Sequence, residues 1–168
     1  MNKLFVAAAA LVALGGSIAF AQQKAPAEAT TFATKVAASN TFEIESSELA
    51  NDRAERNDVK SFAKQMIADH QKAGQDFKSA VQAANMPAPR EEPNAKQQGI
   101  LKKLQAAKGK SFDQAYVKAQ VDAHKEAVTL FKGYSTRGKT APLKQFAQKT
   151  LPTLEHHLHM VQDLSKKQ

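Results

Sequence analysis

Cysteine is absent from the 168 residues, and only two tyrosines are present. Without cysteine the chain has no disulfide bonds, thiolate metal ligands or cysteine nucleophiles. The fold must therefore be held by its hydrophobic core, with help only from a metal bound through other side chains. The chain also lacks a glycine-rich phosphate-binding loop and the alternating hydrophobic pattern that is typical of β-strands. These absences favour an all-α protein.

Acidic residues are the minority among the charged side chains. The chain has 24 Lys and Arg against 16 Asp and Glu, which gives a net charge of +8. Such an excess favours contact with anionic partners such as lipid headgroups. The basic residues are scattered along the predicted helix exteriors, however, and form no block. We therefore expect a solvated basic surface with weak contact to anionic envelope components and no nucleic-acid partner, and the sequence does not predict the oligomeric state.

A long hydrophobic run occurs only at the N-terminus. Lys3 precedes an apolar stretch over residues 4–20, and Ala19, Phe20 and Ala21 form a small-x-small cleavage site. This order is typical of a secretory signal peptide. The alternative, an uncleaved anchor, is less favoured because the stretch is short and rich in Ala and Gly. We therefore predict a signal peptide over residues 1–21 and export to the periplasm, with or without association with the outer membrane.

Apolar residues recur at helical spacing in four long segments that follow a predicted flexible stretch over residues 22–30. The spacing predicts helices over about residues 28–54, 58–85, 111–134 and 140–164. Residues 86–110 form a long connection for a bundle, with three prolines before a short predicted helix at about 94–108. Such a link suits a crossover to the other end of the bundle. We therefore predict one helical bundle over residues 31–165.

Each predicted long helix carries one side chain on its apolar face that can bind a metal. These side chains are Glu43, His70, His124 and His157. At a rise of 1.5 Å per residue, each lies roughly 18–23 Å from the start of its helix, so all four fall near mid-height. Three imidazoles and a carboxylate suit a single zinc, iron, manganese or copper ion. The sequence therefore favours a buried layer that binds one transition-metal ion.

A metal-free polar layer is the alternative. In that arrangement Glu43 accepts hydrogen bonds from the histidines, and Tyr116 or Ser39 completes the network. The layer would then fix the helix register, and the protein would act as a structural or interaction module through its basic surface. Enzyme activity is not predicted, because no Ser–His–acid arrangement comes with an oxyanion hole. Redox or hydrolytic chemistry at an open metal position would need a water-accessible channel, which no sequence feature indicates.

Three further polar residues lie next to the predicted ligands. Asp69 lies about 100° away from the apolar stripe of its helix, so we predict a surface carboxylate rather than a partner of a metal ligand. His156 and His159 flank His157, but neighbouring residues on a helix point in different directions. We therefore predict that these two histidines face solvent.

Four motifs in order resemble a large family of exported bacterial proteins that carry a domain of unknown function. The motifs are FEIE at 42–45, VKSFAKQMIADH at 59–70, FDQAYVKAQVDAH at 112–124 and LPTLEHH at 151–157. Members of this family are often labelled predicted outer-membrane proteins and are assigned to the ferritin-like group. The resemblance covers about residues 31–164, and its motifs include all four predicted metal ligands. It implies a four-helix bundle with a long crossover.

The chain departs from the ferritin-like pattern at one point. Di-iron proteins of that group carry a Glu-x-x-His motif on each of two helices. The residues three positions before the histidines are instead Ile67, Val121 and Leu154. This departure argues against ferroxidase or oxygenase chemistry.

Overall fold

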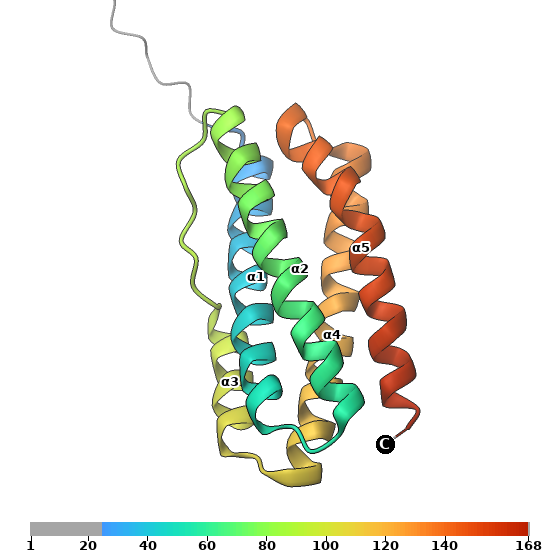
Figure 1. The fold of residues 1–168 in the computed structure, drawn as a ribbon. Coiled ribbons are helices and arrows are strands. Elements are labelled where there is room, and N and C mark those ends of the chain that lie inside the picture. Colours follow the sequence, from blue (N-terminus) through green and yellow to red (C-terminus); the bar gives the residue numbers. More distant parts are fainter. Residues whose placement is uncertain (1–24, 168) are drawn as a thin grey trace, which may run out of the picture.

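The computed structural model describes residues 25–167, and all regular secondary structure in this range is helical. The helices are α1 (Ala27–Arg53), α2 (Asn57–Ala83), α3 (Ala95–Ala106), α4 (Gly109–Arg137) and α5 (Ala141–Ser165). The four long helices lie side by side, and the short α3 packs against α1 and α4 (Figure 1). The predicted all-α bundle is therefore confirmed. The predicted signal peptide over residues 1–21 lies outside the described range.

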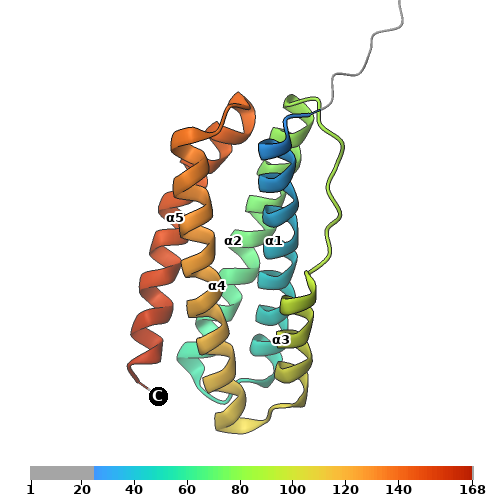
Figure 2. The same ribbon diagram turned by 180° about the vertical axis from the view of Figure 1, so that it is seen from behind.

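The chain crosses the length of the bundle between α2 and α4. In Figure 1, α1 runs downward, α2 and α4 run upward, and α5 runs downward. Residues 84–94 and α3 bring the chain back to the lower end, where α4 begins (Figure 2). Around the bundle, α1 contacts α2 and α4, and α5 contacts the same two helices. No helix in the described range is long and apolar enough to cross a membrane.

Two details at helix starts differ from the prediction. The first helix begins at Ala27, within one residue of its predicted start, but residues 27–30, which were also assigned to the flexible stretch over 22–30, are helical. The physical reason is burial, because Ala29 is fully buried in the same apolar cluster as Phe32. The helix α4 begins at Gly109 rather than at Ser111. Gly109 has a φ of 57°, a left-handed conformation that glycine adopts without strain.

The core contains two large apolar clusters with a polar layer between them, and a small third cluster of Phe42, Leu101 and Ala119. One large cluster contains Phe32, Phe131 and Phe146, and the other contains Phe62, Phe112 and Tyr116. Burial of each such ring contributes roughly 1.5–3 kcal/mol. Between them, at the middle of each long helix, lie buried polar residues; they are Glu43, Ser46, Ser47, His70, Gln120, His124 and His157. The bundle therefore gathers these buried polar side chains at one level, whereas Asp113, which is also buried, lies against the turn between α1 and α2.

The turn between α1 and α2 is held by Asp113 from α4. The Asp113 carboxylate is 1% exposed and accepts the backbone N–H groups of Glu55 at 3.1 Å and Arg56 at 2.9 Å. Amides just before a helix have no partner within the helix, so a side chain must supply one. Asp113 thereby ties the third long helix to the start of the second.

We expect Asp113→Ala to lower the free energy of unfolding by roughly 1.5–3 kcal/mol, because two amides lose a charged acceptor. Asp122→Ala, an exposed position on the same helix, should change it by less than about 0.5 kcal/mol. Urea denaturation followed by circular dichroism measures both values. Equal stability of the two variants would contradict this role for Asp113.

Candidate metal centre

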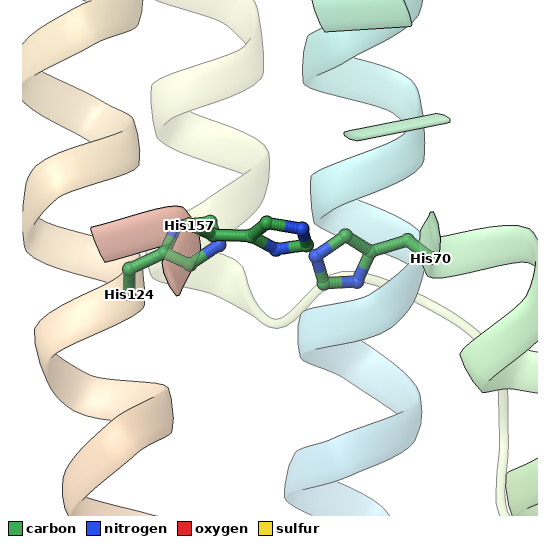
Figure 3. Close-up of side chains that lie close together, drawn as sticks. All are labelled: His70, His124 and His157. Atoms are coloured by element: carbon green, nitrogen blue, oxygen red, sulfur yellow. The ribbon is translucent and has the colours of Figure 1, made fainter. Parts of the chain in front are cut away.

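Three histidines from three different helices meet in the polar layer. His70 comes from α2, His124 from α4 and His157 from α5, and Figure 3 shows their rings directed toward one another. Their exposed fractions are 6%, 0% and 1%. One ring nitrogen from each of the three lies within 4.8 Å of the others. The structure thus brings together three of the four predicted metal ligands.

Each of the three imidazoles also has one nitrogen bonded away from the centre. The pairs are His70 Nδ1 with Asn40 Oδ1 at 3.1 Å, His124 Nδ1 with the Gln120 carbonyl oxygen at 2.9 Å, and His157 Nε2 with Asp69 Oδ2 at 2.9 Å. All three partner atoms are oxygens that accept hydrogen bonds, so each of these nitrogens donates its N–H. A neutral imidazole has only one N–H, and its second nitrogen then carries a lone pair.

The second nitrogens are buried and have no hydrogen-bond partner within the described residues. They are His70 Nε2, His124 Nε2 and His157 Nδ1. Leaving a buried acceptor unpaired costs roughly 1–3 kcal/mol, and a metal ion removes that cost. Nitrogens bound tetrahedrally to zinc at about 2.0–2.1 Å lie about 3.3 Å apart, so a small closure of the rings would suffice. The three lone pairs are therefore well placed to bind one cation.

Burial keeps these imidazoles in the form that binds metals. Loss of hydration lowers the pKa of His124 to about 4 and lowers the pKa of His157. Burial, followed by the two neighbouring rings, holds the pKa of His70 well below its usual value. Since a metal binds the neutral imidazole, the three side chains need not lose a proton at neutral pH before they bind an ion.

Glu43, the fourth predicted ligand, lies beside His124 rather than within the group of three nitrogens. Its Oε1 atom is 3.7 Å from His124 Nδ1, and neither carboxylate oxygen has a hydrogen-bond partner among residues 25–167. Burial raises the pKa of Glu43 to about 8. Its role as a ligand stays a prediction. The structure does not contain the predicted metal-free network, because no histidine donates to Glu43 and the Tyr116 hydroxyl pairs with Ser47 instead, at 2.9 Å.

Asp69 has a different role from the predicted surface carboxylate. It is 37% exposed, yet its Oδ2 accepts the His157 N–H at 2.9 Å. The reason is that α5 packs against α2, so a side chain at the edge of the α2 stripe reaches the neighbouring helix. A carboxylate in this position fixes the ring orientation and increases the basicity of the other nitrogen. His156 and His159 are exposed, as predicted.

We expect Asp69→Asn to weaken metal binding by about 10–100-fold, because the imidazole of His157 loses its charged partner. The matched control is Asp76→Asn, which removes an exposed carboxylate further along the same helix. Isothermal titration of Zn²⁺ into each untagged variant measures the effect. An unchanged affinity in Asp69→Asn would show that the contact with His157 has no role in binding.

Sequence reasoning missed two hydrogen-bond partners of the histidines, Asn40 and Gln120. Asn40 precedes Glu43 by three residues and so shares a helix face with it, whereas Gln120 offers His124 its backbone carbonyl oxygen from four residues earlier in the same helix. That spacing was the available signal. A methyl group at Gly74 would come within 2.9 Å of Asn40 Nδ2, so this glycine lets α2 approach α1 beside the partner of His70.

Comparison with known proteins gives a family and a fold. No curated protein matches the chain in sequence. The structure is similar to the crystal structure of a protein from Streptomyces coelicolor that is described as secreted and named DUF305, with a TM-score of 0.67. The two share 19% sequence identity, and the match covers 82% of this chain and 89% of the other. This likeness supports the helical fold.

The sequence itself matches one family model, described as "Domain of unknown function (DUF4142)", over residues 16–164. The match includes all three histidines of the centre and Glu43, together with every helix except the last residue of α5. The chain therefore belongs to the DUF4142 family.

Proposed function

We propose that this protein is an exported ferritin-like bundle that binds one transition-metal ion for metal handling or protection of the cell envelope. His70, His124 and His157 would supply three nitrogen ligands, and Glu43 would supply the fourth. The observation that carries the proposal is the set of three buried ring nitrogens without partners, one from each histidine, at the centre of the bundle. Export rests on the predicted signal peptide, and contact of the basic surface with anionic envelope components stays a prediction.

The hydrogen-bond pattern favours a metal over a purely structural polar layer. A layer that only fixed helix register would be expected to pair its polar groups with one another. Each histidine instead bonds outward, and the facing nitrogens have no donor among the described residues. Outward hydrogen bonds that orient the rings are typical of metal-binding histidines.

The donor set indicates the class of ion. Imidazole nitrogens suit zinc, copper and iron, whereas calcium and magnesium prefer sites made wholly of oxygen ligands. Three nitrogens with a single carboxylate therefore favour zinc, iron, copper or manganese over magnesium or calcium. One ion bound by ligands from α2, α4 and α5 would also connect three of the four long helices.

Titration of metal-free, untagged protein with Zn²⁺ tests the proposal. We expect one ion to bind per chain. His70→Ala should abolish this binding, whereas His159→Ala, which removes an exposed histidine from α5, should preserve it. The proposal would be wrong if the protein bound no Zn²⁺, Fe²⁺, Mn²⁺ or Cu²⁺, or if His159→Ala removed the binding and His70→Ala did not.

A further inference from the structure

A small chamber lies against His70 and His124. Its volume is about 30 Å³. One part of its wall is polar and is formed by Glu43, His70 and His124. The rest is largely apolar, with Phe77, Phe131 and Phe146 among the lining residues. His157 does not line the chamber, so the chamber faces the proposed metal from the side of the other two histidines.

The size of the chamber limits what it can hold. A water molecule needs roughly 10–15 Å³ of such volume. A chamber of about 30 Å³ therefore has room for a linear molecule of two or three non-hydrogen atoms. A five-membered ring such as imidazole is too large, because the aromatic side chains that form the wall are tightly packed in the core.

Charge selects among the molecules that fit. Three neutral imidazoles and one carboxylate would leave one positive charge of a divalent ion uncompensated. An uncompensated charge in an apolar core is costly, so a monovalent anion that neutralises it is favoured. The chamber combines the proposed ligands Glu43, His70 and His124 with aromatic side chains, so a small ligand would direct its donor atom toward the ion.

A wider groove, which opens to solvent, lies next to the chamber. This groove, of about 660 Å³, lies between α1, α3 and α4, and both cavities are lined by Ser39 and Ala127. The charged residues of the groove are Lys35, Lys96 and Lys125 together with Asp122 and Glu126, so basic side chains exceed acidic ones by one. Basic side chains at the mouth of a cleft raise the local concentration of anions. The two residues that line both the groove and the chamber, Ser39 and Ala127, have small side chains.

We propose that the chamber is a binding site for a small monovalent inorganic anion of up to three non-hydrogen atoms, which contacts the bound metal and enters across the Ser39–Ala127 wall. The inference rests on the proposed metal binding. It adds a ligand class and a route of access to that site.

Cobalt-loaded, untagged protein tests this inference, because the visible spectrum of Co²⁺ reports changes in its ligands. Azide, a linear anion of three atoms, should change the spectrum with saturation, and imidazole should not. Ala127→Leu fills the shared wall and should weaken azide binding at least tenfold. Ala123→Leu, one turn away in the groove but outside the chamber, should leave azide binding unchanged.

A second variant keeps the test valid if the larger side chain at Ala127 disturbs folding. Leu154→Ala enlarges the chamber and should allow imidazole to change the spectrum. Each variant is first titrated with Co²⁺, so that metal binding is measured separately. Stoichiometric cobalt binding with no response to azide, or an equal response to azide and imidazole in the unaltered protein, would overturn the inference and leave the metal site standing. Failure to bind cobalt, zinc or the other candidate ions would overturn both.

Discussion

Zn²⁺ at 100 times its dissociation constant is expected to raise the melting temperature of the metal-free protein by roughly 5–11 °C. At that ratio an ion that binds only the folded state adds about 2.7 kcal/mol to the free energy of unfolding. For a domain of this size, each 1 kcal/mol corresponds to about 2–4 °C. The ion would act on the whole fold because its ligands come from α2, α4 and α5. Differential scanning calorimetry with and without Zn²⁺ measures the shift.

The control for this prediction compares two histidine variants. His124→Ala should show no zinc-dependent shift, whereas His156→Ala, which removes an exposed histidine, should keep the full shift. The quantity to compare is the shift on adding zinc, because truncation of a buried ring also lowers the stability of the metal-free protein. A zinc-dependent shift that survives His124→Ala would place the ion elsewhere.

Glu43→Gln is expected to stabilise the metal-free protein at pH 7 by roughly 2–4 kcal/mol. Burial raises the pKa of Glu43 from 4.5 to about 8, so the folded state holds a proton that the unfolded state has released. The folded state therefore loses stability as the pH rises from 4.5 through 8, at about 1.4 kcal/mol per pH unit. Glutamine has no charge to desolvate and avoids that loss.

The size of this effect should depend on pH, and its sign should depend on whether metal is bound. The difference between Glu43→Gln and the unaltered protein should be near zero at pH 4.5 and should grow toward pH 8. The contribution of His124 has the opposite pH dependence and is the same in both proteins. Because burial lowers its pKa from 6.5 to about 4, the free energy of unfolding falls as the pH drops below 6.5. With zinc bound, loss of the carboxylate should instead lower stability and affinity. Urea denaturation from pH 4.5 to 8 measures these differences.

A Glu43→Gln variant that is less stable than the unaltered protein at pH 7 without metal would contradict the burial of an unpaired carboxyl group. A useful comparison is Glu45→Gln, an exposed position two residues further along α1. That variant should change the free energy of unfolding by less than about 0.5 kcal/mol at every pH.

The convergence of the histidines was accessible from sequence because helices have a fixed rise and a fixed turn. Those two quantities place His70, His124 and His157 near mid-height on inward faces. The crossover was predicted from the length of the segment between the second and third long helices. The resemblance to an exported bacterial family supported the same helical fold, and the family match over residues 16–164 agrees with it.

The partners of His70 and His157 could not be obtained in the same way, because they depend on how the helices pack. Asp69 reaches His157 only because α5 lies against the edge of α2. The same applies to Asn40, which contacts His70 across the interface of α1 and α2 beside Gly74. Helix phase predicts which side chains point inward, whereas side chains at the border of a face bond to whatever the neighbouring helix presents.

The first residues of the helices were also predicted less accurately, because local capping signals compete with tertiary burial. Ser111 was predicted to open the third long helix, but its hydroxyl donates to the Lys108 carbonyl oxygen at 2.7 Å within a helix that begins earlier. The burial of Ala29 similarly extends α1 toward its N-terminus. Neither difference moves the histidines, which lie far from the helix ends.

X-ray absorption at the zinc edge of loaded, untagged protein tests the central claim most directly. We predict three imidazole nitrogens at about 2.0–2.1 Å and one oxygen ligand, with the outer-shell scattering of histidine rings. His156 and His159 should be absent from this count, so a variant with both changed to alanine should give the same spectrum. A spectrum with oxygen ligands alone, or with fewer than three imidazoles, would contradict a metal centre formed by His70, His124 and His157.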